Sequence, residues 1–122
     1  DFTPKTVAKD KMKKRDGIPQ VELTAAPDIL KTVASQQRSL FKVVVGFAAE
    51  SQHLLENATE KLQSKKLDLI VANDISSTDA GFAVDPNRAT LSFADGTREA
   101  LPPMSKTEVA EKIIEHTARL LE

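Results

Sequence analysis

The clearest hydrophobic pattern in the chain is two continuous aliphatic runs separated by an amphipathic segment. Residues 42–48 (KVVVGFA) and 67–73 (LDLIVAN) lack polar alternation, which is typical of strands covered on both faces. Between them, apolar residues at helical spacing predict a helix that Ser51 caps and that runs to Lys65. Its apolar face consists of Leu54, Leu55, Ala58 and Leu62. Strand, helix and strand at this spacing predict a right-handed βαβ unit with parallel strands.

Shorter elements are predicted before and after this unit. A strand over 20–24 precedes a helix from Pro27, a residue favoured at the first helical position, to about Gln37. An irregular stretch over 74–87 leads into a hairpin with strands 89–93 and 97–101, which turns at Asp95-Gly96.

The last predicted element is a helix over 105–121. Ser105 and Glu108 have the spacing of a capping box, which marks its start. Its expected apolar face consists of Val109, Ile113, Ile114, Thr117, Leu120 and Leu121. Together the elements predict an α/β fold, a Rossmann-like three-layer sandwich with a mostly parallel sheet and a β-hairpin extension.

The ends of the two buried strands are the first candidate for a site. In open α/β sheets, ligands bind beyond the carboxyl ends of the parallel strands. This rule selects Phe47 with residues 48–50, and Asn73 with Asp74. Purely structural roles remain open for each of them: Phe47 as a core residue, Glu50 and Ser51 as helix caps, and Asn73-Asp74 as a turn.

Composition excludes several classes of function. A length of 122 residues with 40% apolar residues fits a single domain with a real core. Aromatic residues at 4% and a pI near 6.2 argue against nucleic acid as a partner. The absence of cysteine excludes disulfides and thiolate metal sites and favours the cytoplasm. No apolar run has transmembrane length, and the start DFTPKTV has no apolar region typical of a signal peptide. We therefore expect a soluble protein without a membrane partner.

Phosphate-binding and metal-binding motifs of the common kinds are absent from the sequence. The four glycines are far apart in the sequence, so no glycine-rich phosphate-binding loop is predicted. His53 and His116 have no metal-ligand spacing, and no metal site is predicted.

A basic cluster stands out near the start of the chain. Residues 8–17 contain Lys9, Lys11, Lys13, Lys14 and Arg15, although the formal net charge of the chain is only −1. Such a cluster is either a solvated surface or a segment that an anion orders. Like charges a few ångströms apart repel by about 1 kcal/mol per pair in water, so we expect the free segment to be mobile. The residues alone therefore indicate a Rossmann-like half-domain for a phosphorylated ligand.

Seven segments, in order, carry a resemblance to a known family. They are DFTP, KDKMKK, APDIL, VVVGFAAES, KLQSKKLDLIVANDIS, DPNRATL and LPPMSKTEVAEKI. The chain resembles phosphopantothenoylcysteine synthetase over all 122 residues. In bacteria that domain usually follows a flavin-dependent phosphopantothenoylcysteine decarboxylase in one bifunctional protein of coenzyme A biosynthesis, and the resemblance places FMN in the decarboxylase only.

The resemblance also implies a division of the chain. Residues 1–122 would form the C-terminal two-thirds of one synthetase domain, with a flap at about 5–19, a βαβ core at 20–74, a hairpin at 88–101 and a helix at 105–121. The glycine-rich turn and catalytic asparagine of the family would lie upstream of Asp1, so the piece is expected to be inactive alone.

The activity implied by the resemblance is a two-step ligation. The carboxylate of 4'-phosphopantothenate attacks the α-phosphate of CTP, and the acyl-cytidylate is then opened by the amino group of L-cysteine. Mg²⁺ would bridge the phosphates. The family works as a homodimer in which the neighbouring chain completes part of the substrate pocket.

The same resemblance assigns roles to individual residues. Lys11 would be the catalytic, nucleotide-contacting lysine on the flap. Asp1 would lie at both the nucleotide and the substrate site, and Asn73 would contact the pantothenate moiety. Further nucleotide contacts would be Pro27, Asp28, Ile29, Leu30, Phe47, Lys61 and Lys65. The family has Asn where this chain has Ala26.

Two other hypotheses about function remain open from the sequence. One is a non-catalytic nucleotide-binding or dimerisation module, and the other is a Rossmann-like half-domain that acts on a different nucleotide. The preference for CTP over ATP is likewise not decided by the residues.

Overall fold

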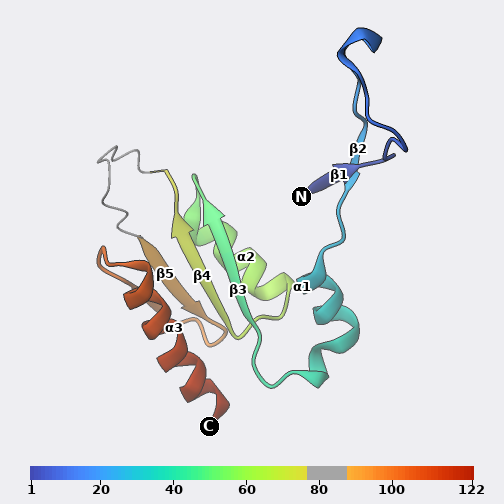
Figure 1. The fold of residues 1–122 in the computed structure, drawn as a ribbon. Coiled ribbons are helices and arrows are strands. Elements are labelled where there is room, and N and C mark those ends of the chain that lie inside the picture. The colour runs from blue at the N-terminus through green and yellow to red at the C-terminus, as the bar shows by residue number, and fades with distance from the viewer. Residues whose placement is uncertain (77–87) are drawn as a thin grey trace.

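The computed structural model describes residues 1–76 and 88–122, and its centre is a four-stranded sheet with the order β3-β4-β5-β6 (Figure 1). The strands are β3 (Val45–Glu50), β4 (Leu69–Asp74), β5 (Ala89–Phe93) and β6 (Arg98–Ala100). β3 is parallel to β4, whereas β4–β5 and β5–β6 are antiparallel. The α/β class is confirmed, but the mostly parallel sheet expected from the sequence is mixed. Among the described strands only β3 and β4 are parallel, because the hairpin strands β5 and β6 extend the sheet with antiparallel pairing.

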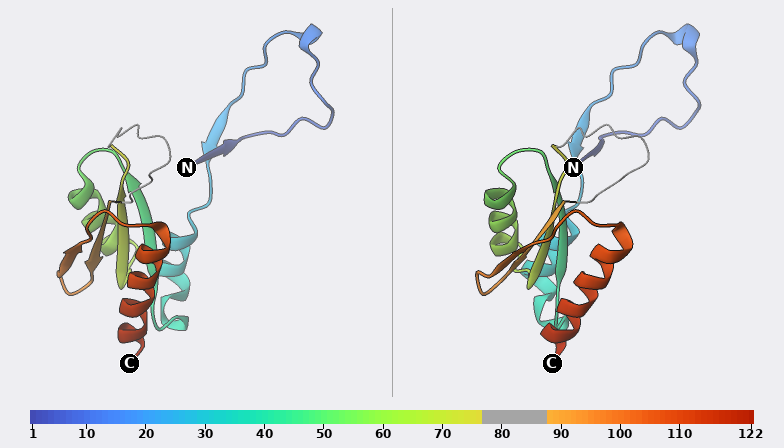
Figure 2. Two further views of the ribbon diagram at one scale, coloured as in Figure 1. Left: turned by 60° about the vertical axis from the view of Figure 1, so that its left-hand side comes forward. Right: turned by 90° about the vertical axis from the view of Figure 1, so that its left-hand side faces the viewer.

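Helices cover both faces of this sheet. Helix α2 (Leu54–Ser64) lies on one face and α3 (Lys106–Leu121) lies on the other (Figure 2). Alternate residues of β4 supply the two cores, because successive side chains of a strand point to opposite faces. Ile70 and Ala72 belong to the cluster under α2, and Leu69 and Val71 belong to the cluster under α3. The three-layer arrangement expected from the sequence is therefore confirmed.

A short helical segment precedes β3. Helix α1 (Ile29–Thr32) continues into a π-helical turn (Val33–Gln37) and a 3-10 turn (Arg38–Leu40). Asp28 is the N-cap, and its carboxylate accepts a hydrogen bond from the backbone N–H of Lys31 at 3.0 Å. The expected helix therefore starts two residues after Pro27. The strand before it, β2 (Leu23–Ala25), overlaps the end of the expected strand over 20–24.

The start of α2 differs from the prediction. Ser51 was expected to be its N-cap, but the N-cap is His53, which has a left-handed backbone with a φ of 50° and makes no side-chain cap. The helix starts later because β3 continues to Glu50, so the chain needs residues 51–53 to turn from the strand into the helix.

The end of α2 is a Schellman motif. The N–H of Leu67 donates to the carbonyl of Leu62 at 2.9 Å, and the N–H of Lys66 donates to Gln63 at 3.2 Å. Lys66 takes the left-handed position, with a φ of 50°, that usually favours glycine. The apolar pair Leu62 and Leu67 is buried across the motif and fixes the turn into β4.

The capping box of α3 is confirmed. The hydroxyl oxygen of Ser105 accepts from the N–H of Glu108 at 3.1 Å, and the Glu108 carboxylate accepts from the N–H of Ser105 at 3.3 Å. The expected apolar face is wrong in part, because Ile114 is 66% exposed and Leu120 and Leu121 are also exposed. His116 packs inward instead, since its ring meets Phe93 on β5.

The hairpin after β4 turns where the sequence indicates. Asp95 accepts from the N–H and the hydroxyl of Thr97, and Gly96 has a φ of 92°. The irregular stretch expected over 74–87 lies outside the described residues from 77 onward.

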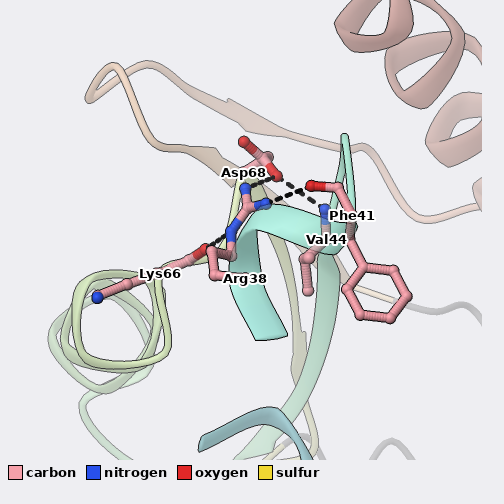
Figure 3. A network of polar contacts seen from close by, with 5 residues as sticks. All are labelled: Arg38, Phe41, Val44, Lys66 and Asp68. Atoms are coloured by element: carbon pink, nitrogen blue, oxygen red, sulfur yellow. Dashed lines mark hydrogen bonds and ion pairs between the residues drawn. The ribbon is translucent and has the colours of Figure 1, made fainter. Parts of the chain in front are cut away.

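Arg38 links the segment after α1 to the sheet (Figure 3). Its guanidinium donates to the carbonyl of Lys66 at 2.8 Å, to the carbonyl of Phe41 at 2.7 Å and to the carboxylate of Asp68 at 2.5 Å. The same Asp68 oxygen accepts from the N–H of Val44 at 2.7 Å. The network fixes where β3 and β4 begin and thereby holds α1 beside the sheet.

The N-terminal region forms a separate ribbon. Strand β1 (Phe2–Pro4) pairs antiparallel with β2, and the chain between them extends away from the four-stranded sheet (Figure 2). Residues 5–22 are all exposed and contain one 3-10 turn, Lys14–Asp16. It includes residues 5–19, which the resemblance predicts to be a flap.

Candidate functional site

The candidate site is a cleft between the ribbon, α1, the carboxyl end of β3 and α2. Its volume is about 670 Å³. The residues that line it are Asp1, Ala26, Pro27, Asp28, Ile29, Leu30, Phe47, Ala48, Ala49, Lys61 and Lys65. All of the nucleotide contacts that the resemblance implied, except Lys11, therefore lie around one cavity.

Lys61 on α2 and Lys65, the C-cap residue of that helix, both line the cleft. Lys61 and Lys65 are one turn apart, as their i, i+4 spacing indicates. The ammonium of Lys61 donates to a carboxylate oxygen of Glu50 at 2.5 Å, and the ammonium of Lys65 lies 3.2 Å from a carboxylate oxygen of Asp28. Each lysine is thus held in place by an acidic residue from another element.

The carboxylates of these two pairs are stabilised in their charged form. The hydrogen bond from Lys61, followed by that from Asn57, lowers the pKa of Glu50 below its ordinary value. The backbone N–H of Lys31, followed by the ammonium of Lys65, lowers the pKa of Asp28. Both ion pairs are therefore present at neutral pH, with the side chain of Glu50 only 13% exposed.

Phe47 forms an apolar part of the cleft wall. It lies on β3 and is 69% exposed, although the aliphatic residues before it suggest a core position. An exposed aromatic ring beside two cations offers a flat surface for a planar ring. The alternative in which Phe47 is a core residue is wrong.

Asn73 lies in a different hollow, on the α3 face of the sheet. This groove has a volume of about 410 Å³ and is lined mainly by apolar residues of β3, β4, β5 and α3. The side-chain oxygen of Asn73 is buried there and has no hydrogen-bond partner among the described residues. Phe47 lines both the cleft and the groove, so it lies between Asn73 and the two lysines.

Asp1 and Lys11, which were also predicted to be site residues, lie in the N-terminal region. Asp1 lines the cleft, and its carbonyl accepts from the N–H of Ala26 at 2.8 Å. Lys11 is exposed on the segment that extends from the ribbon and does not line the cleft. The structure therefore brings Asp1 to the lysines of α2 and leaves Lys11 apart from them.

Sequence reasoning missed the role of Glu50. It was considered as a helix cap, whereas its carboxylate accepts from Lys61 and, at 3.2 Å, from Asn57. One feature of the sequence could have predicted this pair: a carboxylate at the end of a buried strand is followed eleven residues later by a lysine on the next helix.

No helix within residues 1–76 and 88–122 has the length and apolar character that spanning a bilayer requires. The same ranges contain no cluster of three or more His, Asp or Glu side chains able to hold a metal ion.

A cleft at the carboxyl end of a parallel strand, between helices of a three-layer sandwich, is typical of ligand-binding domains of the open α/β class. The chain belongs to the family described as DNA/pantothenate metabolism flavoprotein C-terminal domain, whose model matches residues 1–121. The family membership expected from the sequence is thereby confirmed.

Curated relatives and solved structures agree with this assignment. The chain is 47% identical over 120 residues to the coenzyme A biosynthesis bifunctional protein CoaBC of Bacillus subtilis and 36% identical over 123 residues to that of Vibrio vulnificus. These matches cover 98% and 99% of the chain but only 29% and 30% of the relatives. A crystal structure of the C-terminal domain of such a protein matches with a TM-score of 0.73 and 33% identity, over 99% of this chain and 50% of that one.

Proposed function

We propose that this chain is the nucleotide-binding part of a coenzyme A biosynthesis ligase that joins 4'-phosphopantothenate to L-cysteine at the expense of CTP. The observation that carries the proposal is the convergence of Asp1, residues 27–30, Phe47, Lys61 and Lys65 on one cleft. These residues come from four separate parts of the chain, so their convergence is a property of the fold. Relatives named as coenzyme A biosynthesis proteins support the same assignment.

Lys61 and Lys65 would bind the phosphates of the nucleotide. An ammonium about 4 Å from a phosphate oxygen gains roughly 4 kcal/mol at an effective dielectric of 20. Before the nucleotide arrives, Glu50 and Asp28 hold the two ammonium groups beside the cleft. The acidic partners therefore reduce the side-chain entropy that the lysines lose on binding.

Mg²⁺ would enter with the nucleotide and would not be held by a cage of protein ligands. Mg²⁺ is usually bound through substrate phosphates and one or two carboxylates. The carboxylates of Asp1 and Asp28 are on residues that line the cleft, which fits this mode. The ion would supply neutralisation of charge on the phosphates.

The base of the nucleotide would lie against Phe47. Stacking of a base on an aromatic side chain contributes about 1–3 kcal/mol. The exposed position of the ring at the cleft wall supports this role. An aromatic face accepts any base, so the preference for CTP over ATP would come from polar contacts elsewhere in the cleft.

The proposed reaction has two steps, each with its own leaving group. A carboxylate oxygen of 4'-phosphopantothenate forms a bond to the α-phosphorus of CTP, and pyrophosphate leaves. The amino nitrogen of cysteine then forms a bond to the acyl carbon, releases a proton, and CMP leaves. Lys11, carried over the cleft by the flap, would offset the charge that moves onto pyrophosphate in the first step.

The acyl substrate would lie on the Asn73 side of Phe47. Pantothenate carries amide and hydroxyl groups, and the unpartnered buried oxygen of Asn73 supplies an acceptor for one of them. A homodimer in which the neighbouring chain completes the pocket remains part of the proposal. FMN belongs to a fused decarboxylase domain and has no proposed site in this chain.

Calorimetric titration of the chain with CTP and Mg²⁺ tests the proposed cleft. Lys61→Gln and Lys65→Gln should each raise the Kd about tenfold or more, because each removes one charged hydrogen bond to phosphate. Lys112→Gln on α3 is the control of equal charge change and should leave the Kd within about twofold. Equal losses in all three variants would show non-specific charge attraction and overturn the cleft assignment.

Two further measurements separate the candidate functions. A parallel titration with ATP decides which nucleotide is preferred. Ligation of cysteine should be measured in the complete domain, since this chain covers only half of the solved domain it matches. We expect the chain alone to bind CTP without forming product; tight CTP binding with no ligation even in the complete domain would favour the non-catalytic nucleotide-binding module.

A further inference from the structure

A second polar hollow lies between α2 and the β5–β6 hairpin. It has a volume of about 250 Å³ and opens beside the side of α2 that faces the hairpin. We call it the hairpin hollow; its polar lining includes Thr59, Lys66, Ser92, Thr97 and Arg98. None of its lining residues lines the proposed nucleotide cleft.

The lining of the hairpin hollow is positively charged. Lys66 and Arg98 line it, and no aspartate or glutamate does so among the described residues. Neither cation forms an ion pair with a described carboxylate. One oxygen of the Asp95 carboxylate, in the adjacent turn, accepts from both the N–H and the hydroxyl of Thr97. The net charge of the lining therefore favours an anion.

Arg98 is positioned by a neighbour on α2. One terminal nitrogen of its guanidinium donates to the hydroxyl of Thr59 at 3.0 Å, and that hydroxyl donates to the carbonyl of Leu55 at 2.7 Å. The guanidinium has five N–H donors, and this contact uses one of them. The rest have no partner among the described residues, which leaves a fixed fork of donors beside the hollow.

Ser92 adds an unpartnered hydroxyl to the same place. The residue is only 2% exposed, and its side-chain oxygen has no hydrogen-bond partner among the described residues. A buried hydroxyl without a partner is costly, so a native structure that retains one calls for an explanation. An acceptor in the hollow would satisfy it.

The floor of the hairpin hollow strengthens these interactions. Leu62 and Leu67 line it and are 7% and 3% exposed, so one side of any bound ion faces hydrocarbon. Charge–charge attraction grows as the local dielectric constant falls. Two cations and a hydroxyl above an apolar floor suit a small ion with several acceptor oxygens.

We propose that the hairpin hollow binds a phosphate-sized oxyanion, either inorganic phosphate or the phosphate group of a small monoester. The guanidinium of Arg98 would donate two parallel hydrogen bonds, as it does to many phosphates, and Ser92 would donate one. Lys66 would contribute its charge. The site is separate from the nucleotide cleft and does not depend on the proposed ligase activity.

The test is an NMR titration of the isotope-labelled chain with inorganic phosphate, at ionic strength held constant with sodium chloride. We expect saturable shifts of the Ser92 and Arg98 amides. Arg98→Gln should raise the phosphate Kd about tenfold or more, because a charged bidentate contact is lost. Arg119→Gln on α3 removes the same charge at a distance and should leave the Kd within about twofold.

Ser92→Ala and a cleft variant complete the experiment. In the absence of phosphate, Ser92→Ala should leave the thermal midpoint unchanged or raise it, since the change removes an unpartnered hydroxyl. In the presence of phosphate, the increase in thermal midpoint should be smaller than in the parent chain. Lys65→Gln should leave the Ser92 and Arg98 shifts intact, which separates this site from the cleft. A second titration with glycerol 3-phosphate decides between free phosphate and a monoester by which binds more tightly.

Three outcomes would overturn the proposal. The first is the absence of saturable shifts at Ser92 and Arg98 with either phosphate compound. The second is an equal loss of affinity in Arg98→Gln and Arg119→Gln, which would reflect net charge only. The third is loss of the shifts in Lys65→Gln, which would place the phosphate in the nucleotide cleft.

Discussion

Replacing Arg38 should show how strongly the network in Figure 3 holds α1 beside the sheet. Arg38→Met keeps much of the aliphatic stem but removes three hydrogen bonds, to the carbonyls of Lys66 and Phe41 and to the carboxylate of Asp68. Among the described contacts, the carboxylate of Asp68 would keep the bond from the N–H of Val44. The side chains of Arg38 and Asp68 are 25% and 26% exposed, so solvent screens part of the loss.

The expected magnitude follows from these contacts. Hydrogen bonds to a charged group contribute about 1.5–3 kcal/mol each when buried, and partial exposure lowers the total to about 2–4 kcal/mol for Arg38→Met. Asp68→Asn retains an acceptor for Val44 and should cost less, about 1–2 kcal/mol. In a double-mutant cycle the two residues should show a coupling of about 1 kcal/mol or more, because they share one network.

Urea unfolding measures this effect. With a slope of about 2 kcal/mol per molar, in the middle of the usual range, Arg38→Met should lower the urea midpoint by roughly 1–2 M. Amide exchange over residues 29–44 should rise more than exchange within β4, since the network holds that segment locally. Arg119→Met, an exposed arginine on α3, is the matched control and should change the free energy of unfolding by less than about 0.5 kcal/mol. If Arg38→Met behaves like this control, the network does not stabilise the fold and the reasoning is refuted.

Three further outcomes are expected. Lys61 and Asn57 lower the pKa of Glu50 in the folded chain, so the free energy of unfolding should fall as the pH drops below the ordinary pKa of 4.5. In urea midpoints measured against pH, Glu50→Gln should flatten this acidic part of the curve. Lys66→Gly should raise the free energy of unfolding by about 0.5–1 kcal/mol, since glycine suits the left-handed C-cap position; a lower urea midpoint would contradict this. In the complete domain, Lys11→Gln should slow pyrophosphate release far more than it changes the thermal midpoint, whereas Lys14→Gln should reduce the rate only slightly. An equal loss of rate in both variants would mean that the segment is only a solvated basic surface.

The sequence by itself determined the elements whose signals are local. The aliphatic runs around 42–48 and 67–73 and the helix between them gave the βαβ unit, because burial on both faces and helical periodicity are properties of neighbouring residues. The capping box at Ser105 and the turn at Asp95-Gly96 depend on three or four consecutive residues, and both are confirmed. Among the cleft residues, Phe47 and residues 48–49 were also selected by the rule that ligands bind at strand ends. The other predicted cleft residues, Asp1, 27–30, Lys61 and Lys65, were reachable only through a resemblance to a family, since each has an ordinary structural role when taken alone.

The tertiary structure decided what depends on residues far apart in the chain. Periodicity carries no information about which edge of β4 the hairpin joins, so the mixed strand order appeared only in the fold. The same holds for the pairing of Glu50 with Lys61, eleven residues apart, and of Arg38 with Asp68, thirty residues apart. It also holds for the placing of Asn73 on the face opposite α2, because the face a strand residue occupies depends on which layers cover the sheet. These contacts form when packing brings whole elements together, and a local pattern of residues does not specify that geometry.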